Sequence, residues 1–136
     1  MPYINTVTNV AIPKATEKEL AAEFGKNIGL IKGKTENWLM LNFTENSNMY
    51  FAGSDAPTAM VEIQIFGKAS DKEYDDLTQA TCKLINEKLG IPENRIYVKY
   101  GEYDRWGWKY PNLRPGQQPK ALQSDIHGGR QLPKRH

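Results

Sequence analysis

The sequence predicts an α/β domain made of two tandem βαβ units, with two helices on one face of a four-stranded mixed sheet. Two observations lead to this fold class. The predicted elements run strand, helix, strand and short strand, then strand, helix and strand, so that two units of similar length follow each other. The usual right-handed crossover in each unit places both helices on the same face. The 136 residues, 39% of them hydrophobic, are enough for one domain with a packed core.

The first unit begins with a strand over residues 3–8, where β-branched and aromatic side chains predominate. Thr16 and Glu19 have the spacing of a capping box, which satisfies unpaired backbone groups at a helix start. A helix over residues 16–31 follows, because apolar side chains recur there at helical spacing (Leu20, Phe24, Ile28 and Ile31). Residues 37–43 predict the next strand, and residues 49–52 predict a shorter one.

The second unit begins with residues 58–66, where side chains alternate and place Val61, Ile63 and Ile65 on the face that the helices cover. Ser70 and Glu73 form a second capping box. The helix that follows has an apolar stripe and ends at Gly90; the stripe contains Tyr74, Leu77, Thr81, Leu84 and Ile85. Residues 95–100 predict the next strand, and residues 106–110 predict a last short one.

The other face of the predicted sheet is too apolar to be left fully in water. It contains Met60, Phe66, Tyr97 and one of Trp38 and Leu39. Association through that face or its edges is the simplest way to cover these side chains, and association with further copies of the same chain is the usual form. We therefore expect an oligomer.

The net charge divides the chain near residue 110. Residues 111–136 have a net charge of +4, from Arg114, Lys120, Arg130, Lys134 and Arg135 against Asp125; because the whole chain carries +2, residues 1–110 carry −2. A body with this charge lacks the electrostatic footprint of a nucleic-acid-binding protein. We expect residues 1–110 to form the domain and residues 111–136, which contain four of the eight prolines, to form an extended or disordered basic tail.

Targeting signals are also missing from the sequence. No apolar run approaches the roughly 20 residues of a membrane span, and the N-terminus lacks the basic and apolar regions of a signal peptide. The single cysteine, Cys82, excludes an internal disulfide and fits a reducing compartment. These features predict a cytoplasmic protein that does not bind membranes.

The histidines narrow the possible chemistry, because His127 and His136 both lie in the tail. A Ser-His-Asp or Cys-His centre and a Cys/His zinc site are therefore not expected in residues 1–110, and we expect no metal. Acid–base chemistry there must use a carboxylate, a lysine, a tyrosine or the amino terminus. Removal of Met1 would leave Pro2 with a free amine of ordinary pKa about 8, which burial or a neighbouring ammonium would lower.

Several separated motifs carry a more specific signal. In chain order they are Pro2–Thr6 with Asn9, Gly33–Lys34, Gly53–Pro57, Ile65–Lys68, Asn94–Tyr100 and Gly107–Trp108. Together they resemble the macrophage migration inhibitory factor family of the tautomerase superfamily, over about residues 1–110. The resemblance implies the twin βαβ fold, a homotrimer, and keto–enol tautomerisation of phenylpyruvate-like 2-oxo acids without a cofactor. It also implies an alternative, a cytokine-like protein that binds a receptor and is secreted without a signal peptide.

The resemblance also implies roles for single residues. Pro2 matches the catalytic base, and Lys34 matches the lysine that binds the substrate's carboxylate or enolate, which orients the anion and stabilises charge on oxygen. Phe66 lies at the pocket wall beside the proline, where the family usually has isoleucine.

Four further residues complete the implied site. Tyr97 matches a tyrosine supplied by the adjacent subunit, and Lys99 replaces an asparagine that binds substrate from that subunit. With a strand period of two, Tyr97 and Lys99 share a face, so we expect Lys99 to place a second cation beside Lys34. Trp38 at the pocket mouth and Trp108 at its rim match aromatic residues that suit an aryl substrate.

Each of these roles has a structural alternative. Lys34 could be a solvated cation that stabilises the last carbonyls of the first helix. Tyr97 could fill the sheet, and Trp106 and Trp108, two residues apart, could cover a subunit edge.

Overall fold

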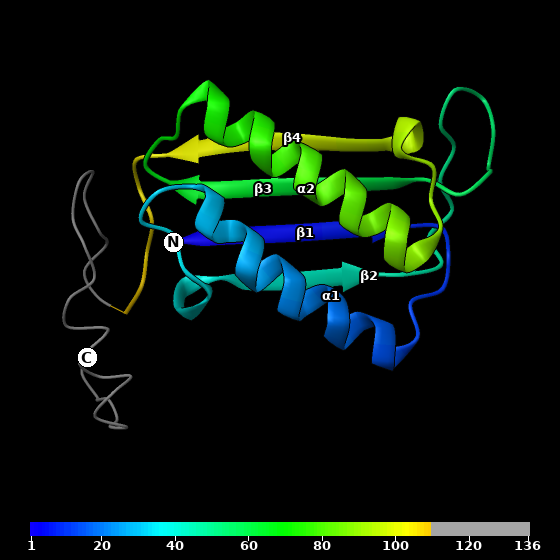
Figure 1. The fold of residues 1–136 in the computed structure, drawn as a ribbon, viewed down its shortest axis with the longest axis horizontal. Helices are drawn as coiled ribbons and strands as arrows, with labels where there is room; N and C mark the ends of the chain where they lie inside the picture. The colour runs from blue at the N-terminus through cyan, green and yellow to red at the C-terminus, as the bar shows by residue number, and fades with distance from the viewer. Residues whose placement is uncertain (110–136) are drawn as a thin grey trace.

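The computed structural model describes residues 1–109 (Figure 1). Its strands are β1 (Pro2–Thr8), β2 (Met40–Thr44), β3 (Ala59–Phe66) and β4 (Ile96–Tyr103), and its helices are α1 (Lys14–Asn27) and α2 (Asp71–Leu89). The predicted tail, residues 111–136, lies outside the described residues.

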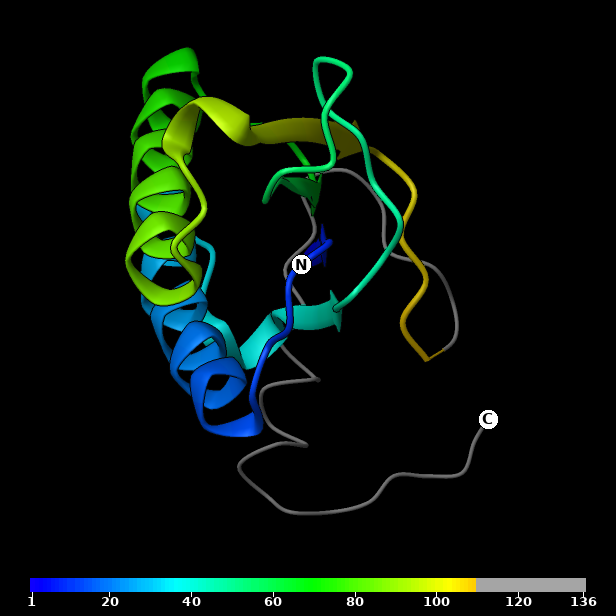
Figure 2. The same cartoon turned by 90° about the vertical axis from the view of Figure 1, so that its right-hand side faces the viewer.

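The strands form one mixed sheet in the order β2-β1-β3-β4. β1 pairs in parallel with β2 and antiparallel with β3, and β3 pairs in parallel with β4. Both helices cover the same face of this sheet, as Figures 1 and 2 show from two sides. The predicted pair of βαβ units is therefore confirmed, and β1 and β3 are the two central strands.

The core lies between the helices and the sheet, on the side predicted. Val61, Ile63 and Ile65 of β3 are fully buried against residues of both helices, among them Leu20, Phe24, Leu77 and Ile85. Each such side chain contributes about 1.5–3 kcal/mol by leaving water. The apolar stripes predicted for the two helices are the stripes that the structure buries.

The two predicted capping boxes have different outcomes. At α2 the Ser70 hydroxyl accepts from the Glu73 N–H and the Glu73 carboxylate accepts from the Ser70 N–H, as predicted. At α1 the prediction was wrong: the helix begins two residues earlier, after Pro13, and has no side-chain cap. Proline has a backbone angle suited to a helix start, so the carbonyl of Pro13 accepts the first helical hydrogen bond, from the Glu17 N–H.

The short apolar segments were the least well predicted. Residues 36–38 form a single 3-10 turn, and β2 begins only at Met40, so that Leu39 packs against the main core instead of the open face. Residues 49–52 contribute only an isolated bridge between Phe51 and Ser54. Residues 106–109 do not form the last strand that was predicted; Tyr110 is outside the described residues.

The face of the sheet opposite the helices is more polar than predicted. Met40 and Tyr97 are 66% and 57% exposed on it. Between them, one register row crosses all four strands and consists of Asn42, Asn5, Glu62 and Lys99. These four side chains are joined by hydrogen bonds and an ion pair. Phe66, which was predicted on this face, is covered within the chain itself, by Met1 and the nearby tryptophans.

Candidate active site

The amino end of the chain lies at the start of the central strand β1. Pro2 opens β1 and pairs with Ile65 of β3, and the carbonyl of Met1 accepts a hydrogen bond of 3.0 Å from the Phe66 N–H. Met1 is only 9% exposed and packs with Phe66 into a small cluster that Trp38, Trp106 and Trp108 cover. The amino end is thus held in a fixed place by sheet hydrogen bonds and by apolar contacts.

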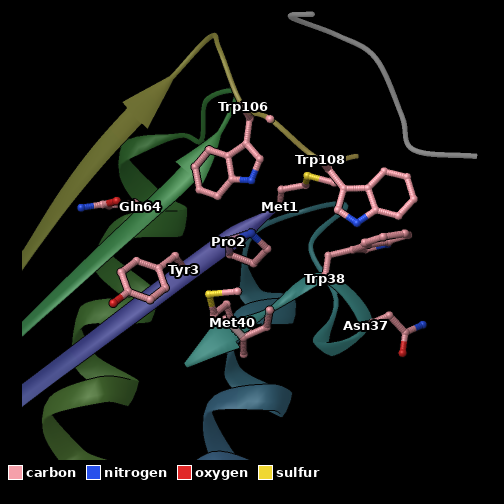
Figure 3. A pocket seen from close by; sticks show the side chains of 11 residues that line it. Met1, Pro2, Tyr3, Asn37, Trp38, Met40, Gln64, Trp106 and Trp108 are labelled. Carbon is pink, nitrogen blue, oxygen red and sulfur yellow. The ribbon is translucent and has the colours of Figure 1, made fainter. Parts of the chain in front are cut away.

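A cavity of about 610 Å³ opens beside this amino end (Figure 3). Its walls come from four parts of the chain: the start of β1, the segment before and at the start of β2, Gln64 of β3, and the segment after β4. The lining residues are Met1, Pro2, Tyr3, Asn37, Trp38, Leu39, Met40, Gln64, Trp106, Gly107 and Trp108. Aromatic and other apolar side chains dominate, which is typical of a pocket for a small organic ligand.

Lys34 reaches the same corner from a turn beyond α1, which ends at Asn27, earlier than predicted, and is followed by a 3-10 turn over Ile28–Leu30. It follows Gly33, whose φ of +85° is a left-handed conformation that glycine adopts easily. The Lys34 ammonium donates a hydrogen bond of 2.6 Å to the carbonyl of Phe66 and also contacts the terminal amine of Met1. Lys34 is partly buried, so it is not the solvated helix-end cation of the alternative interpretation.

The pKa values at this corner show which group holds the proton. Burial first, and then the Lys34 ammonium, lower the pKa of the Met1 amine from 8.0 to about 5. Burial also lowers the pKa of Lys34, whereas its hydrogen bond to the amine raises it. At neutral pH the amine is therefore neutral and Lys34 is the cation. A neutral amine beside a cation, in an apolar pocket, can take a proton from an anionic ligand that the cation holds.

The structure groups the predicted site residues in two places. Pro2, Trp38 and Trp108 line the cavity, and Lys34 and Phe66 lie behind Met1 at its inner end. Trp38 and Trp108 meet edge to face, with ring centroids 6.1 Å apart. Five of the seven predicted residues thus gather around the amino end within one chain.

Tyr97 and Lys99 do not join this group within one chain. Tyr97 packs edge to face against Phe51, with centroids 4.9 Å apart, and Lys99 forms an ion pair of 3.0 Å with Glu62. Neither residue lines the cavity. A role for them in the pocket, and a second cation beside Lys34, therefore require a neighbouring subunit and stay predictions.

Sequence reasoning missed several lining residues, of which Trp106 is the largest. It lies on the same cavity as Trp108, although residues 106–109 are not a strand. Tyr3 and Met40 were also missed. Strand alternation places Tyr3, which is partly buried, and Met40, which is exposed, on the face away from the helices. The sequence has no signal that a segment 60 or more residues away would form a wall above them.

The described residues show neither a metal-binding cluster nor a membrane-spanning helix. Over residues 1–109, no group of three or more His, Cys, Asp or Glu side chains is arranged to hold a metal ion. Over the same residues, neither helix is long and apolar enough to cross a membrane.

Residues 1–110 match the family model of macrophage migration inhibitory factor. The macrophage migration inhibitory factor of Xenopus laevis is 25% identical over 100 residues, which are 74% of this chain and 86% of the relative. The macrophage migration inhibitory factor homolog of Brugia malayi is 27% identical over 103 residues, with the same two shares of 74% and 86%.

Two solved structures show the same fold. The Leishmania major protein MIF2 has a TM-score of 0.78 at 29% sequence identity, covering 83% of this chain and 97% of that chain. The macrophage migration inhibitory factor-like protein of Entamoeba histolytica has a TM-score of 0.73 at 23% identity, covering 82% and 98%. On the match of residues 1–110, this chain belongs to the macrophage migration inhibitory factor family, which includes tautomerases and cytokine-like members.

Proposed function

We propose that this protein, after removal of Met1, is a cofactor-free tautomerase of phenylpyruvate-like 2-oxo acids. One observation carries the proposal: the chain's amino end lies in an aromatic pocket, in contact with Lys34, where the pKa of a terminal amine falls to about 5. Removal of Met1 makes the nitrogen of Pro2 the terminal amine of the same corner. The secondary amine of Pro2 is then a base that is neutral at the pH of the cell.

The reaction moves one proton between carbon and oxygen. Lys34 binds the carboxylate of the 2-oxo acid, and the nitrogen of Pro2 removes a proton from carbon 3. The electron pair of that C–H bond forms a double bond between carbons 2 and 3, and the carbonyl oxygen becomes an enolate oxygen. The protonated Pro2 nitrogen then gives its proton to the enolate oxygen, which yields the enol and restores the neutral amine, and the reverse sequence gives the ketone. The Lys34 cation stabilises the negative charge as it develops on oxygen.

Removal of Met1 changes two further features of the corner. The Phe66 N–H loses its acceptor, the carbonyl of Met1, and becomes available to an oxygen of the substrate. The side chain of Met1 also leaves the cluster that Trp38, Trp106 and Trp108 cover, which adds apolar volume to the pocket. Met1 therefore both blocks the nitrogen of Pro2 and fills the space beside it.

The experiment compares three proteins whose N-termini are verified by mass spectrometry: the chain starting at Pro2, the same chain with Pro2→Gly, and the chain that retains Met1. We expect the first to interconvert the enol and keto forms of phenylpyruvate, and the other two to lose about 10²-fold or more in kcat/KM. Equal turnover by all three proteins would refute Pro2 as the base.

The alternative for this family is a cytokine-like binding protein, and the name of the Xenopus laevis relative is the observation that favours it. The Pro2→Gly protein separates the two functions. Signalling through a receptor that survives this substitution, in a chain without measurable turnover, would assign the main role to binding.

A further inference from the structure

Trp106 is the largest lining residue of the pocket to which the resemblance assigns no role. All three tryptophans of the chain line the one cavity. Trp38 and Trp108 form an edge-to-face pair, and Trp106 stands apart from that pair (Figure 3). Together the three indoles cover Met1 and Phe66. The side chain of Met1 thus lies in a slot with Trp106 on one side and the other two tryptophans on the other (Figure 3).

The position of Trp106 is fixed by the end of β4. The carbonyl of Tyr103, the last residue of β4, accepts a hydrogen bond of 2.8 Å from the Gly67 N–H, and its ring meets Trp106 at 6.0 Å between centroids. The Tyr103 ring also folds back over Gly101, where a Cβ atom would come within 3.0 Å of it. Glycine at position 101 therefore leaves room for the ring that supports Trp106.

A slot between aromatic walls distinguishes ligands by shape. A planar ring can stack on one indole and meet the edge of another, and such contacts add to the gain from buried area alone. A branched aliphatic group of similar length fills the same space without these contacts. Phe66 at the inner end of the slot adds a further aromatic surface.

We propose that Trp106 determines the specificity of this pocket, and that it selects 2-oxo acids with an aryl group over those with an aliphatic group of similar length. The proposal rests on the proposed function, because it assumes that Met1 has been removed and that Lys34 holds the acid group. Trp106 contributes to binding and not to proton transfer, so it acts on the choice of substrate and leaves the chemistry to Pro2.

The first test measures kcat/KM for phenylpyruvate and for 4-methyl-2-oxopentanoate with the chain starting at Pro2. Trp106→Leu is expected to lower the ratio of the two values about tenfold, mainly through the KM of phenylpyruvate, and Trp106→Phe to restore most of it. Tyr50→Leu is the control, because this side chain is 75% exposed and lines no part of the cavity. An unchanged ratio in Trp106→Leu would overturn the proposal.

The second test separates this proposal from the proposed function. Calorimetry measures binding of 3-phenylpropionate and of 4-methylpentanoate, which have no keto group and cannot react. We expect the aryl acid to bind about tenfold more tightly, and this preference to disappear in Trp106→Leu. If neither 2-oxo acid turns over but this preference is found, the tautomerase assignment fails and the role of Trp106 stands. Equal affinities of the two acids in the unsubstituted chain would overturn the role of Trp106.

Discussion

At the scale of single residues, the candidate site depends on where one proton lies between Lys34 and the terminal amine. The ammonium of Lys34 is held by the Phe66 carbonyl, and burial together with this cation lowers the pKa of the amine to about 5. A base acts in its unprotonated form, so a lowered pKa extends activity to lower pH. We therefore expect kcat/KM to rise with pH along a limb that lies below neutrality.

Replacement of Lys34 tests the electrostatic part of this picture. Lys34→Met removes the cation, so the pKa of the amine rises and the ascending limb of kcat/KM moves to higher pH. The limb is expected to stay below the ordinary value of 8, because burial is the larger cause of the shift and remains. The plateau also falls, since the carboxylate loses its partner. A pH–rate profile measures both effects, with the exposed Lys32→Met as the control. A limb that does not move would remove Lys34 from the environment of the base.

The charge that Lys99 offers to a ligand depends on its partner in an ion pair, Glu62. Its carboxylate pairs with Lys99 at 3.0 Å and accepts from Asn5 at 3.2 Å, and these contacts lower its pKa. An exposed pair of this kind contributes at most about 1 kcal/mol to stability. The pair also affects binding at the open face: because the Glu62 carboxylate neutralises Lys99, the two side chains together present no net charge to an anionic ligand.

Glu62→Gln is therefore expected to change binding more than stability. If Lys99 reaches a neighbouring subunit's pocket, the unpaired cation lowers KM for a 2-oxo acid several-fold at low ionic strength, and added salt removes the gain. The double variant Glu62→Gln/Lys99→Gln is the control and should lose the gain. A KM that is unchanged in Glu62→Gln would leave Lys99 as a surface residue with no part in the site.

At the scale of elements, the two helix starts show how far a local motif can be read. Ser70 and Glu73 predicted α2 correctly, because both halves of the capping box are formed. Thr16 and Glu19 have the same spacing, but the helix begins earlier, after Pro13, and the side chain of Thr16 makes no capping bond. A local pattern thus predicts that a helix forms. The residue at which the helix begins depends here on which of two nearby start signals is used, Pro13 or the Thr16/Glu19 spacing.

This difference gives a paired prediction for stability. Ser70→Ala is expected to cost about 1 kcal/mol, because the Glu73 N–H loses the Ser70 hydroxyl as its acceptor, whereas the Glu73 carboxylate still accepts from the backbone N–H of residue 70. Thr16→Ala is expected to change the free energy of unfolding by less than about 0.5 kcal/mol, since no cap is lost and alanine favours the helix. Urea unfolding measures both values. A larger loss for Thr16→Ala than for Ser70→Ala would contradict the observed helix starts.

The motifs that carry the family resemblance are not all parts of the site. Asn9 donates to the carbonyls of Asp55 and Ala56 and accepts from the Thr58 N–H. The guanidinium of Arg95 donates to four carbonyls of the same loop, those of Phe51, Ser54, Ala56 and Pro57. These two side chains fasten the loop before β3 to β1 and β4. Their motifs therefore identify the fold, and the roles of the pocket residues need separate tests.

At the scale of the whole molecule, sequence reasoning succeeds where the signal is periodic and fails where contacts are distant. The alternation of Val61, Ile63 and Ile65 predicted the buried face of β3, and the helical spacing of apolar residues together with the right-handed crossover predicted both helices on that face. The place of Trp106 depends on how the segment after β4 crosses the amino end, and no periodic pattern encodes that crossing. The resemblance supplied Lys34 and Trp108, whereas Trp106 required the structure.

The proposed homotrimer makes the site incomplete within one chain, and this can be tested by complementation. Pro2→Gly removes the base from one chain, and Tyr97→Ala/Lys99→Ala removes the contribution to a neighbour's pocket from another. Tyr97 is 57% exposed, so its loss leaves the core intact.

Each variant alone is expected to be inactive or nearly so. In trimers co-expressed at equal amounts, about one quarter of the sites combine an intact Pro2 with an intact neighbour, and a similar share of the activity should return. Light scattering checks that both variants remain trimers, because only then does the comparison concern the site. If Tyr97→Ala/Lys99→Ala alone keeps full activity, these two residues have no place in the pocket. If both variants are inactive and mixing restores no activity, Tyr97 and Lys99 act in the same chain as Pro2, and the shared site is refuted.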